Sequence, residues 1–406
     1  MESGRPSLRA NVADMPDAPA TISRPILAGV VTALVGFTSS FAVVLTGLSA
    51  VGASPLQAAS GLLALSLTMG LASAVLAWRY RMPITAAWST PGAALLAATG
   101  VVEGGWSAAI GAFLVVAALT LLAGLWPGFG RLIARIPASI AQAMLAGVLL
   151  PLCLAPITGI VQNPWGVLPV VLTWLIFLRL APRWAVPLAF VASAVVVAVE
   201  LIRTGSGVDA ALLVPRLELT APTFTLGALV GIALPLFVVT MASQNAPGIA
   251  TLKASGYSAP VSLLIVITGG IALAFSPFGV YSICIAAITA AICQSPEAHP
   301  QADQRWKAAA TAGVFYLLAG IFGGSITSLM AALPVAWIQM LAGLALLGTI
   351  SGSLVQALAK ENERDAAIVT FLVTASGLTL SGVGSAFWGL VAGGMCFSLL
   401  SLARRA

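Results

Sequence analysis

The sequence has few charged residues and lacks the groups that carry most enzyme chemistry. Only 7% of its 406 residues are charged, whereas soluble domains carry roughly 25%. No Asp or Glu lies in the middle of an apolar stretch, and the single histidine, His299, lies between two such stretches. The four cysteines have neither metal-site nor disulfide spacing. The sequence therefore predicts no enzyme, no metal site and no cofactor, and the lack of a GxxxxGK[ST] loop argues against ATP-driven pumping.

Long apolar stretches dominate the rest of the chain. Hydrophobic residues make up 60% of it and the mean hydropathy is +1.06, and a membrane span needs about 20 apolar residues. We expect an all-α polytopic membrane protein with about fourteen transmembrane segments and no large soluble domain. The segments are expected at 25–51, 55–78, 83–99, 106–125, 136–154, 165–178, 185–202, 226–244, 260–275, 278–293, 308–322, 326–347, 366–380 and 383–402.

The positive charges support this count. With the N-terminus in the cytoplasm, sixteen of the eighteen Lys and Arg residues fall on the inner side, and only Arg203 and Arg216 fall outside. Such an excess is the positive-inside rule, so the net charge of +6 reports topology and not nucleic-acid binding. We expect a multi-pass protein of the inner membrane with both termini cytoplasmic. Residues 1–24 lack the apolar core of a signal peptide and form a cytoplasmic tail.

The chain divides into two similar halves. The polar outside loop at 203–223 separates residues 25–202 from residues 224–406, with seven segments on each side. The third segment of each half opens with proline and a short β-prone stretch, at 83–90 and 277–282. Since seven is odd, the two halves have opposite orientations. Interrupted segments at matching positions of inverted repeats are typical of a transporter's binding site.

The stretch at 83–97, PITAAWSTPGAALLA, predicts a short extended piece followed by a half-helix. Ser89 or Thr90 is a good N-cap, Pro91 suits the first helical turn, and the Ala-rich stretch that follows favours helix. Irregular backbone at membrane depth is tolerated where protein buries it or where it lines a wet cavity. The alternative is a proline-kinked transmembrane helix without a ligand. The same pattern predicts a second half-helix with an extended piece in segment ten.

Polar side chains inside the membrane are neutral, and they suggest a site for an anion. Two facing half-helix starts would attract negative charge without a permanent cation. Pro247 and Gly248 are expected to stop the eighth helix just after its two amides. The residues expected at a binding site are Ser89, Thr90, Gly92, Trp88, Phe37, Ser40, Gln244, Asn245, Tyr281 and Cys284. Helix capping or interhelical hydrogen bonding is the alternative role for the two amides.

Three motifs resemble the benzoate/proton symporter (BenE) family. They are AWSTPGAA at 87–94, SQNAPG at 243–248 and IAAITAAIC at 285–293, with PEAH following at 296–299. The resemblance covers nearly the whole chain and implies seven-plus-seven inverted repeats related to nucleobase and anion transporters. It also implies a core domain from segments 1–4 and 8–11, a gate domain from segments 5–7 and 12–14, and a site between segments three and ten.

The family resemblance implies proton-coupled uptake of benzoate or a similar small aromatic carboxylate across the bilayer. The oligomeric state stays open, with a homodimer as one alternative. One stretch departs from the family, which often has a His and an Asn at the start of the tenth half-helix, where this sequence reads GVYSIC at 279–284. A different small carboxylate therefore stays open. Two further alternatives are a nucleobase-type permease, which is expected to keep carboxylates in segments eight and ten, and an anion channel on the same fold.

Overall fold

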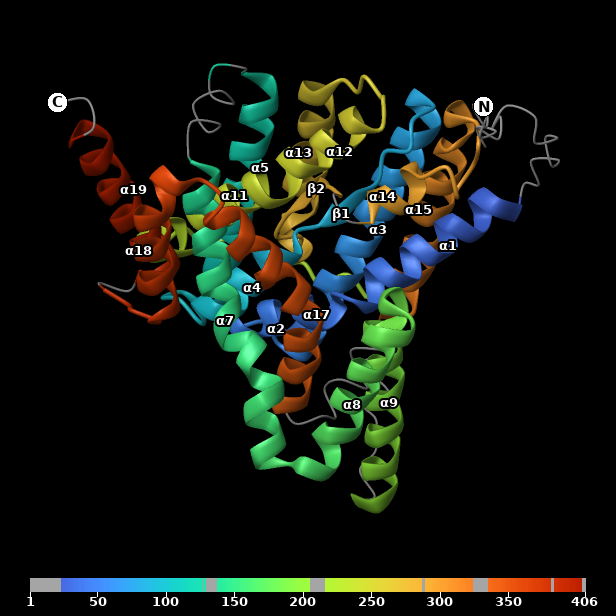
Figure 1. The fold of residues 1–406 in the computed structure, drawn as a ribbon, viewed down its shortest axis with the longest axis horizontal. Coiled ribbons are helices and arrows are strands. Elements are labelled where there is room, and N and C mark those ends of the chain that lie inside the picture. Colours follow the sequence, from blue (N-terminus) through green and yellow to red (C-terminus); the bar gives the residue numbers. More distant parts are fainter. Residues whose placement is uncertain are drawn as a thin grey trace, which may run out of the picture.

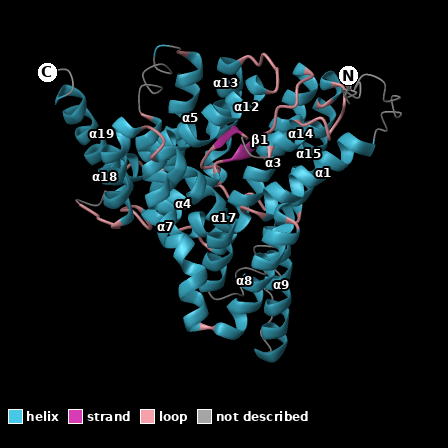
Figure 2. Cartoon of the chain, in the orientation of Figure 1, coloured by secondary structure: helices cyan, strands magenta, loops and turns pink. Residues whose placement is uncertain are grey.

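The computed structural model is a helical membrane protein built around two short extended pieces that pair with each other (Figure 1). It describes residues 23–126, 128, 137–204, 216–286, 289–323, 335–380 and 383–403. Among these residues the two strands are three residues long each, and they lie in the middle of the surrounding helices (Figure 2). Most of the expected tail at 1–24 and the middle of the loop at 203–223 lie outside the described residues.

The first half supplies seven segments in chain order, and two of them are interrupted. A break at Ser39 and Ser40 divides the first, and a strand precedes the helix of the third. The elements are α1 (Ser23–Thr38) with α2 (Phe41–Ala50), α3 (Pro55–Tyr80), β1 (Ala86–Trp88) with α4 (Thr90–Thr99), α5 (Gly105–Leu125), α7 (Ala138–Gln162), α8 (Pro164–Leu180) and α9 (Ala185–Thr204), with the turn η2 (Pro182–Trp184) before α9.

The second half repeats this order. Segment eight combines α10 (Leu226–Ala228), η4 (Leu229–Ala233), α11 (Leu234–Thr240), η5 (Met241–Asn245) and α12 (Ala246–Ala254). The remaining six are α13 (Val261–Phe275), β2 (Ile283–Ile285) with α14 (Ala290–Gln294), α15 (Trp306–Ile321), α17 (Val335–Ala357), α18 (Arg364–Ala375) and α19 (Ser385–Ala403). Short turns η6 (Ser276–Phe278), η7 (Ala302–Gln304) and η8 (Glu361–Glu363) lie between them.

The expected fold class is confirmed: the elements form fourteen transmembrane segments in two inverted repeats of seven. Among the described residues, eight helical stretches are long and apolar enough to cross a membrane unaided. The other six segments are the helices α8, α9, α15 and α18 and the strand-plus-helix units of segments three and ten. Those two units confirm that the chain has half-helices preceded by short extended pieces, as the proline-rich stretches predicted.

Helix packing follows the symmetry of the repeats. Segment two packs on segment eleven (α3 on α15), and segment nine packs on segment four (α13 on α5), so each pair is the other's counterpart in the opposite repeat. Glycine permits both contacts. A Cβ on Gly70 would lie 2.7 Å from the carbonyl oxygen of Gly313, and one on Gly269 would lie 2.7 Å from the amide nitrogen of Leu121. Close backbone approach of this kind replaces the hydrophobic driving force that helices lack in lipid.

Segment eight differs from the expectation at its proline. Pro247 and Gly248 do not stop the helix, which continues to Ala254. The π-helical turn η5 runs directly into α12, and Pro247 follows it at the point where the hydrogen-bond ladder already departs from the α-helical pattern, which accommodates its missing N–H. Such π turns recur at functional sites, and this one carries the amides Gln244 and Asn245.

Candidate functional site

The two strands hold the centre of the molecule together. They pair antiparallel, with Ala86 opposite Ile285 and Trp88 opposite Ile283. Their outer edges are satisfied by side chains from neighbouring helices: the Ser73 hydroxyl receives the Ala86 N–H at 2.8 Å, and Asn245 Oδ1 receives the Ile285 N–H at 2.9 Å. Backbone groups at a strand edge that is buried at membrane depth need hydrogen-bond partners. Asn245 supplies such a partner to the backbone of β2.

The start of α4 is capped as the sequence predicts. Ser89 is the N-cap, its Oγ accepts the Gly92 N–H at 3.1 Å, and Pro91 lies in the first turn. Thr240 also donates to Ser89 Oγ, at 2.9 Å. Since Pro91 has no N–H and the Gly92 N–H is used, Thr90 carries the amide of this turn that meets no acceptor among the described residues. One N–H at the positive end of the α4 dipole is thus free to donate to water or to a bound group.

A cavity of about 660 Å³ opens beside Thr90, within the usual range for small-molecule sites. Segments one, three, eight and ten line it together with parts of α7, η2, α9 and α17 and with single residues of α3 and α15. None of the described residues that line it is charged. Its polar lining consists of Ser39, Ser40, Thr90, Gln142, Ser243, Gln244, Thr289, Tyr316, Thr349, Ser353 and Gln356.

An aromatic wall lies next to the polar groups. Trp88 lines the cavity, and its indole N–H donates to the Ser40 hydroxyl at 2.9 Å. Phe37 packs behind it, with ring centroids 5.5 Å apart, and stacks on Phe41. The polar atom of the indole is thus paired within the protein, and Trp88 forms part of the cavity lining. The site therefore offers neutral donors at one place and an apolar aromatic surface beside them.

The structure brings four of the expected site residues to the cavity: Ser40, Trp88, Thr90 and Gln244. The other six lie close by without lining it. Phe37 backs the indole ring, while Ser89, Gly92 and Asn245 satisfy the local backbone. Tyr281 and Cys284 are fully buried; their side chains bond to the carbonyl oxygens of Ser89 and Ala87.

Segment ten differs in register from the expectation. The half-helix was expected to begin at 281–284, but β2 occupies 283–285 and α14 begins at Ala290. Ile283 and Ile285 are β-branched and pair with β1, which favours the strand. Thr289 is therefore the polar residue that this segment presents to the cavity.

Sequence reasoning missed the polar residues of α7 and α17. Gln142, Ser353 and Gln356 line the cavity, yet they lie outside the broken segments that attracted attention. The available signal was a polar side chain within an apolar helix, because such groups in membrane segments usually face a cavity or another helix.

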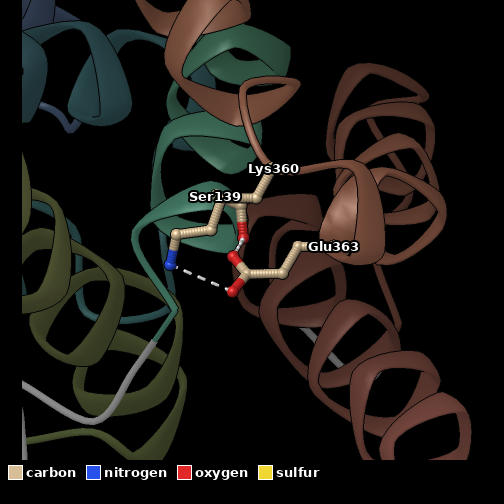
Figure 3. Close-up of polar contacts among 3 residues, drawn as sticks. All are labelled: Ser139, Lys360 and Glu363. Carbon is tan, nitrogen blue, oxygen red and sulfur yellow. Dashed lines mark hydrogen bonds and ion pairs between the residues drawn. The ribbon is translucent and has the colours of Figure 1, made fainter. Parts of the chain in front are cut away.

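A charged contact fixes the beginning of α7 (Figure 3). Glu363 is only 7% exposed; it accepts a hydrogen bond from Ser139 at 2.5 Å and pairs with Lys360 at 3.1 Å. Ser139 lies in the first turn of α7, one turn before Gln142. The contact therefore ties the α17–α18 connection to the helix that carries one wall of the cavity.

Solved structures of membrane transporters share this fold. Murine Slc26a9, an anion transporter captured in the inward-facing state, matches with a TM-score of 0.60 at 14% identity over 95% of this chain and 69% of that one. The transmembrane domain of the cyanobacterial bicarbonate transporter BicA matches with a TM-score of 0.59 at 15% identity over 92% and 97%. A second structure of SLC26A9 also matches, and the chain described here covers 66% of the length of that SLC26A9 chain. At these identities the likeness shows the fold.

The sequence comparisons give the family. The chain belongs to the benzoate membrane transport protein (BenE) family, whose profile matches residues 19–399. It is 54% identical to the inner membrane protein YdcO of Escherichia coli K12 over 93% of this chain and 96% of that protein. It is 33% identical to the benzoate membrane transport protein of Acinetobacter baylyi over 83% and 85%. The protein is thus a multi-pass transporter of the inner membrane and not an enzyme.

Proposed function

We propose that this protein imports benzoate or a similar small aromatic carboxylate, coupled to protons, by alternating access. The observation that carries the proposal is the unpaired Thr90 amide at the positive end of α4, beside the ring of Trp88. A carboxylate accepts from such an amide, and a partly buried helix start contributes up to ~2 kcal/mol toward a negative charge. The aromatic ring packs on Trp88, and Gln244 supplies a further donor.

The cavity supports a division into a core and a gate. Core segments 1–4 and 8–11 supply Thr90, Trp88 and Gln244, while gate segments 5–7 and 12–14 supply Gln142 and Ser353. The gate-side lining reaches the beginning of α7 and the end of α17, where the positive-inside rule puts the cytoplasm. The cavity in this conformation therefore opens inward, and movement of the core against the gate would expose it to the other side.

Proton coupling without a charged lining needs a mobile carrier. No acidic or basic side chain lines the cavity among the described residues, so the proton travels on the substrate carboxyl or on water near the half-helices. Glu103, the acidic residue nearest the core segments, is exposed. The same neutral lining disfavours the nucleobase-type permease, which is expected to use carboxylates in segments eight and ten.

Uptake of labelled benzoate into proteoliposomes tests the proposal. With an inward proton gradient, benzoate should accumulate above its external concentration, and accumulation should persist in Glu103→Gln. A channel would let the label equilibrate and no further. Accumulation that ignores the pH gradient would contradict proton coupling, and a Glu103→Gln protein that transports without pH dependence would make Glu103 the proton carrier.

A further inference from the structure

Gln142 is a largely buried residue whose amide has no hydrogen-bond partner among the described residues. Its side chain lines the cavity from α7, and the residue is only 4% exposed. No described residue hydrogen-bonds its amide, whose two N–H donors and acceptor oxygen are open to the cavity and not sealed within the protein. A buried polar group left without a partner destabilises the folded state unless water or a ligand satisfies it. Gln142 therefore presents a donor and an acceptor to whatever occupies the cavity.

Ser353 adds a second group of the same kind from α17. It is 3% exposed and lines the cavity, and its hydroxyl is likewise open to the cavity without a hydrogen-bond partner among the described residues. Helices α7 and α17 pack along one another. The hydrogen bond of Ser139 to Glu363 holds the α7 turn that precedes Gln142. The two groups thus sit on a fixed wall formed by elements other than those that carry Thr90 and Trp88.

We propose that Gln142 and Ser353 hydrogen-bond a hydroxyl group on the ring of the substrate, so that the protein prefers a hydroxylated aromatic carboxylate to benzoate itself. This inference rests on the proposed function, in which Thr90 takes the carboxylate and Trp88 takes the ring. A hydroxyl both donates and accepts, as an amide and a serine do. A second carboxylate would not suit this wall, because no cation lines the cavity among the described residues.

The chemistry sets the direction of the selectivity. A site built to hydrogen-bond a hydroxyl discriminates against an analogue that lacks it, because the buried protein groups then lose their partner. An apolar pocket discriminates only weakly between a ligand with a hydroxyl and one without it, whichever of the two it prefers. Benzoate would enter the cavity and leave Gln142 unsatisfied, whereas 4-hydroxybenzoate or 3-hydroxybenzoate would satisfy it.

Calorimetric binding of benzoate, 3-hydroxybenzoate and 4-hydroxybenzoate to the purified full-length protein tests this inference. The wild type should bind one hydroxybenzoate about tenfold more tightly than benzoate, which corresponds to about 1.4 kcal/mol. Gln142→Leu and Ser353→Ala should each reduce that preference, while the affinity for benzoate stays within about twofold or rises. Gln339→Leu is the matched control, since Gln339 lies on α17 away from the cavity lining, and it should keep the preference.

The possible outcomes distinguish a failure of the proposed hydroxyl recognition from a failure of the proposed transport function. Benzoate binding without a preference in the wild type, or an equal loss of all three ligands in Gln142→Leu, overturns the hydroxyl-reading role and leaves benzoate transport standing. A wild type that binds none of the three overturns the proposed function itself. Thermal unfolding of each variant checks folding, and Ser353→Ala, which removes a single oxygen atom, keeps the test decisive if Gln142→Leu is unstable.

Discussion

Tyr281 donates a hydrogen bond from its phenolic oxygen to the carbonyl oxygen of Ser89, at 2.9 Å. The two residues belong to opposite repeats, and both are fully buried. Ser89 is also the N-cap of α4 and accepts from Thr240 of segment eight. Segments three, eight and ten therefore meet at one residue, and this residue fixes where α4 begins and where the Thr90 amide points.

Tyr281→Phe should lower thermal stability and leave the fold intact. The ring keeps its place beside Phe113, and the Ser89 carbonyl keeps the Ala93 N–H as a donor. The loss is therefore that of one hydrogen bond, about 0.5–1.5 kcal/mol. Thermal unfolding in detergent measures it. Tyr257→Phe is the control, because Tyr257 bonds to the Ala302 carbonyl in a partly exposed loop, and it should cost less. An equal loss in both variants would argue against a central role for the Tyr281 contact.

Glu363→Ala should destabilise the protein more than its exposed ion pair suggests. The Lys360 side chain is 63% exposed, so that pair alone contributes at most about 1 kcal/mol. Ser139, however, is buried and would lose its acceptor, at a cost of about 1–3 kcal/mol.

The matched variant is Glu363→Gln, which keeps an acceptor oxygen for Ser139. It should retain most of the stability in the same unfolding assay, and Glu361→Ala, at an exposed position, should retain nearly all of it. Equal destabilisation by Ala and Gln at residue 363 would show that the charge, and not the acceptor, holds α7.

The capped half-helix of segment three could be predicted from the sequence. The directions in which the side chains of the neighbouring segment eight point could not. Ser89 and Pro91 carry their own capping signals, so the half-helix could be predicted. Gln244 and Asn245 are adjacent in sequence, yet one lines the cavity and the other bonds to β2. The π turn that carries them changes the helical period and therefore the directions of the two side chains. No residue pattern in the sequence predicted this turn.

The register of segment ten and the role of Gln142 depended on tertiary contacts. Ile283 and Ile285 join a strand because β1 is there to pair with, so the half-helix starts later than the local pattern suggested. A lone glutamine in an apolar helix is compatible with a cavity or with an interhelical bond. Only the packing of α7 against the broken segments decides between them.

The orientation of the chain is tested by labelling from each side of the membrane. Single cysteines at residues 209 and 303, in a background without the four native cysteines, should react with a membrane-impermeant reagent from opposite sides. Residue 209 belongs to the loop between the two halves, which is not among the described residues, and it should react with reagent added on the extracytoplasmic side. Asp303 lies in η7, in a loop expected in the cytoplasm, and residue 303 should react from that side. Labelling of both residues from the same side would contradict the inverted orientation of the two halves.

The direct test of the proposed site is binding of benzoate to Thr90→Glu. A carboxylate near a helix start is compatible with the helix, so the protein should fold with a thermal stability close to that of the wild type. The new negative charge would lie where the substrate carboxylate binds. Affinity should therefore fall about a hundredfold or more, since like charges in contact cost several kcal/mol.

Gln356→Glu is the control for that measurement. It adds the same charge to the cavity lining at an exposed position on α17, and it should weaken benzoate binding only a few-fold because solvent screens it. The account predicts loss of benzoate binding in a well-folded Thr90→Glu protein together with retained binding in Gln356→Glu. Benzoate affinity in Thr90→Glu equal to that of the wild type would contradict a carboxylate site at the start of α4.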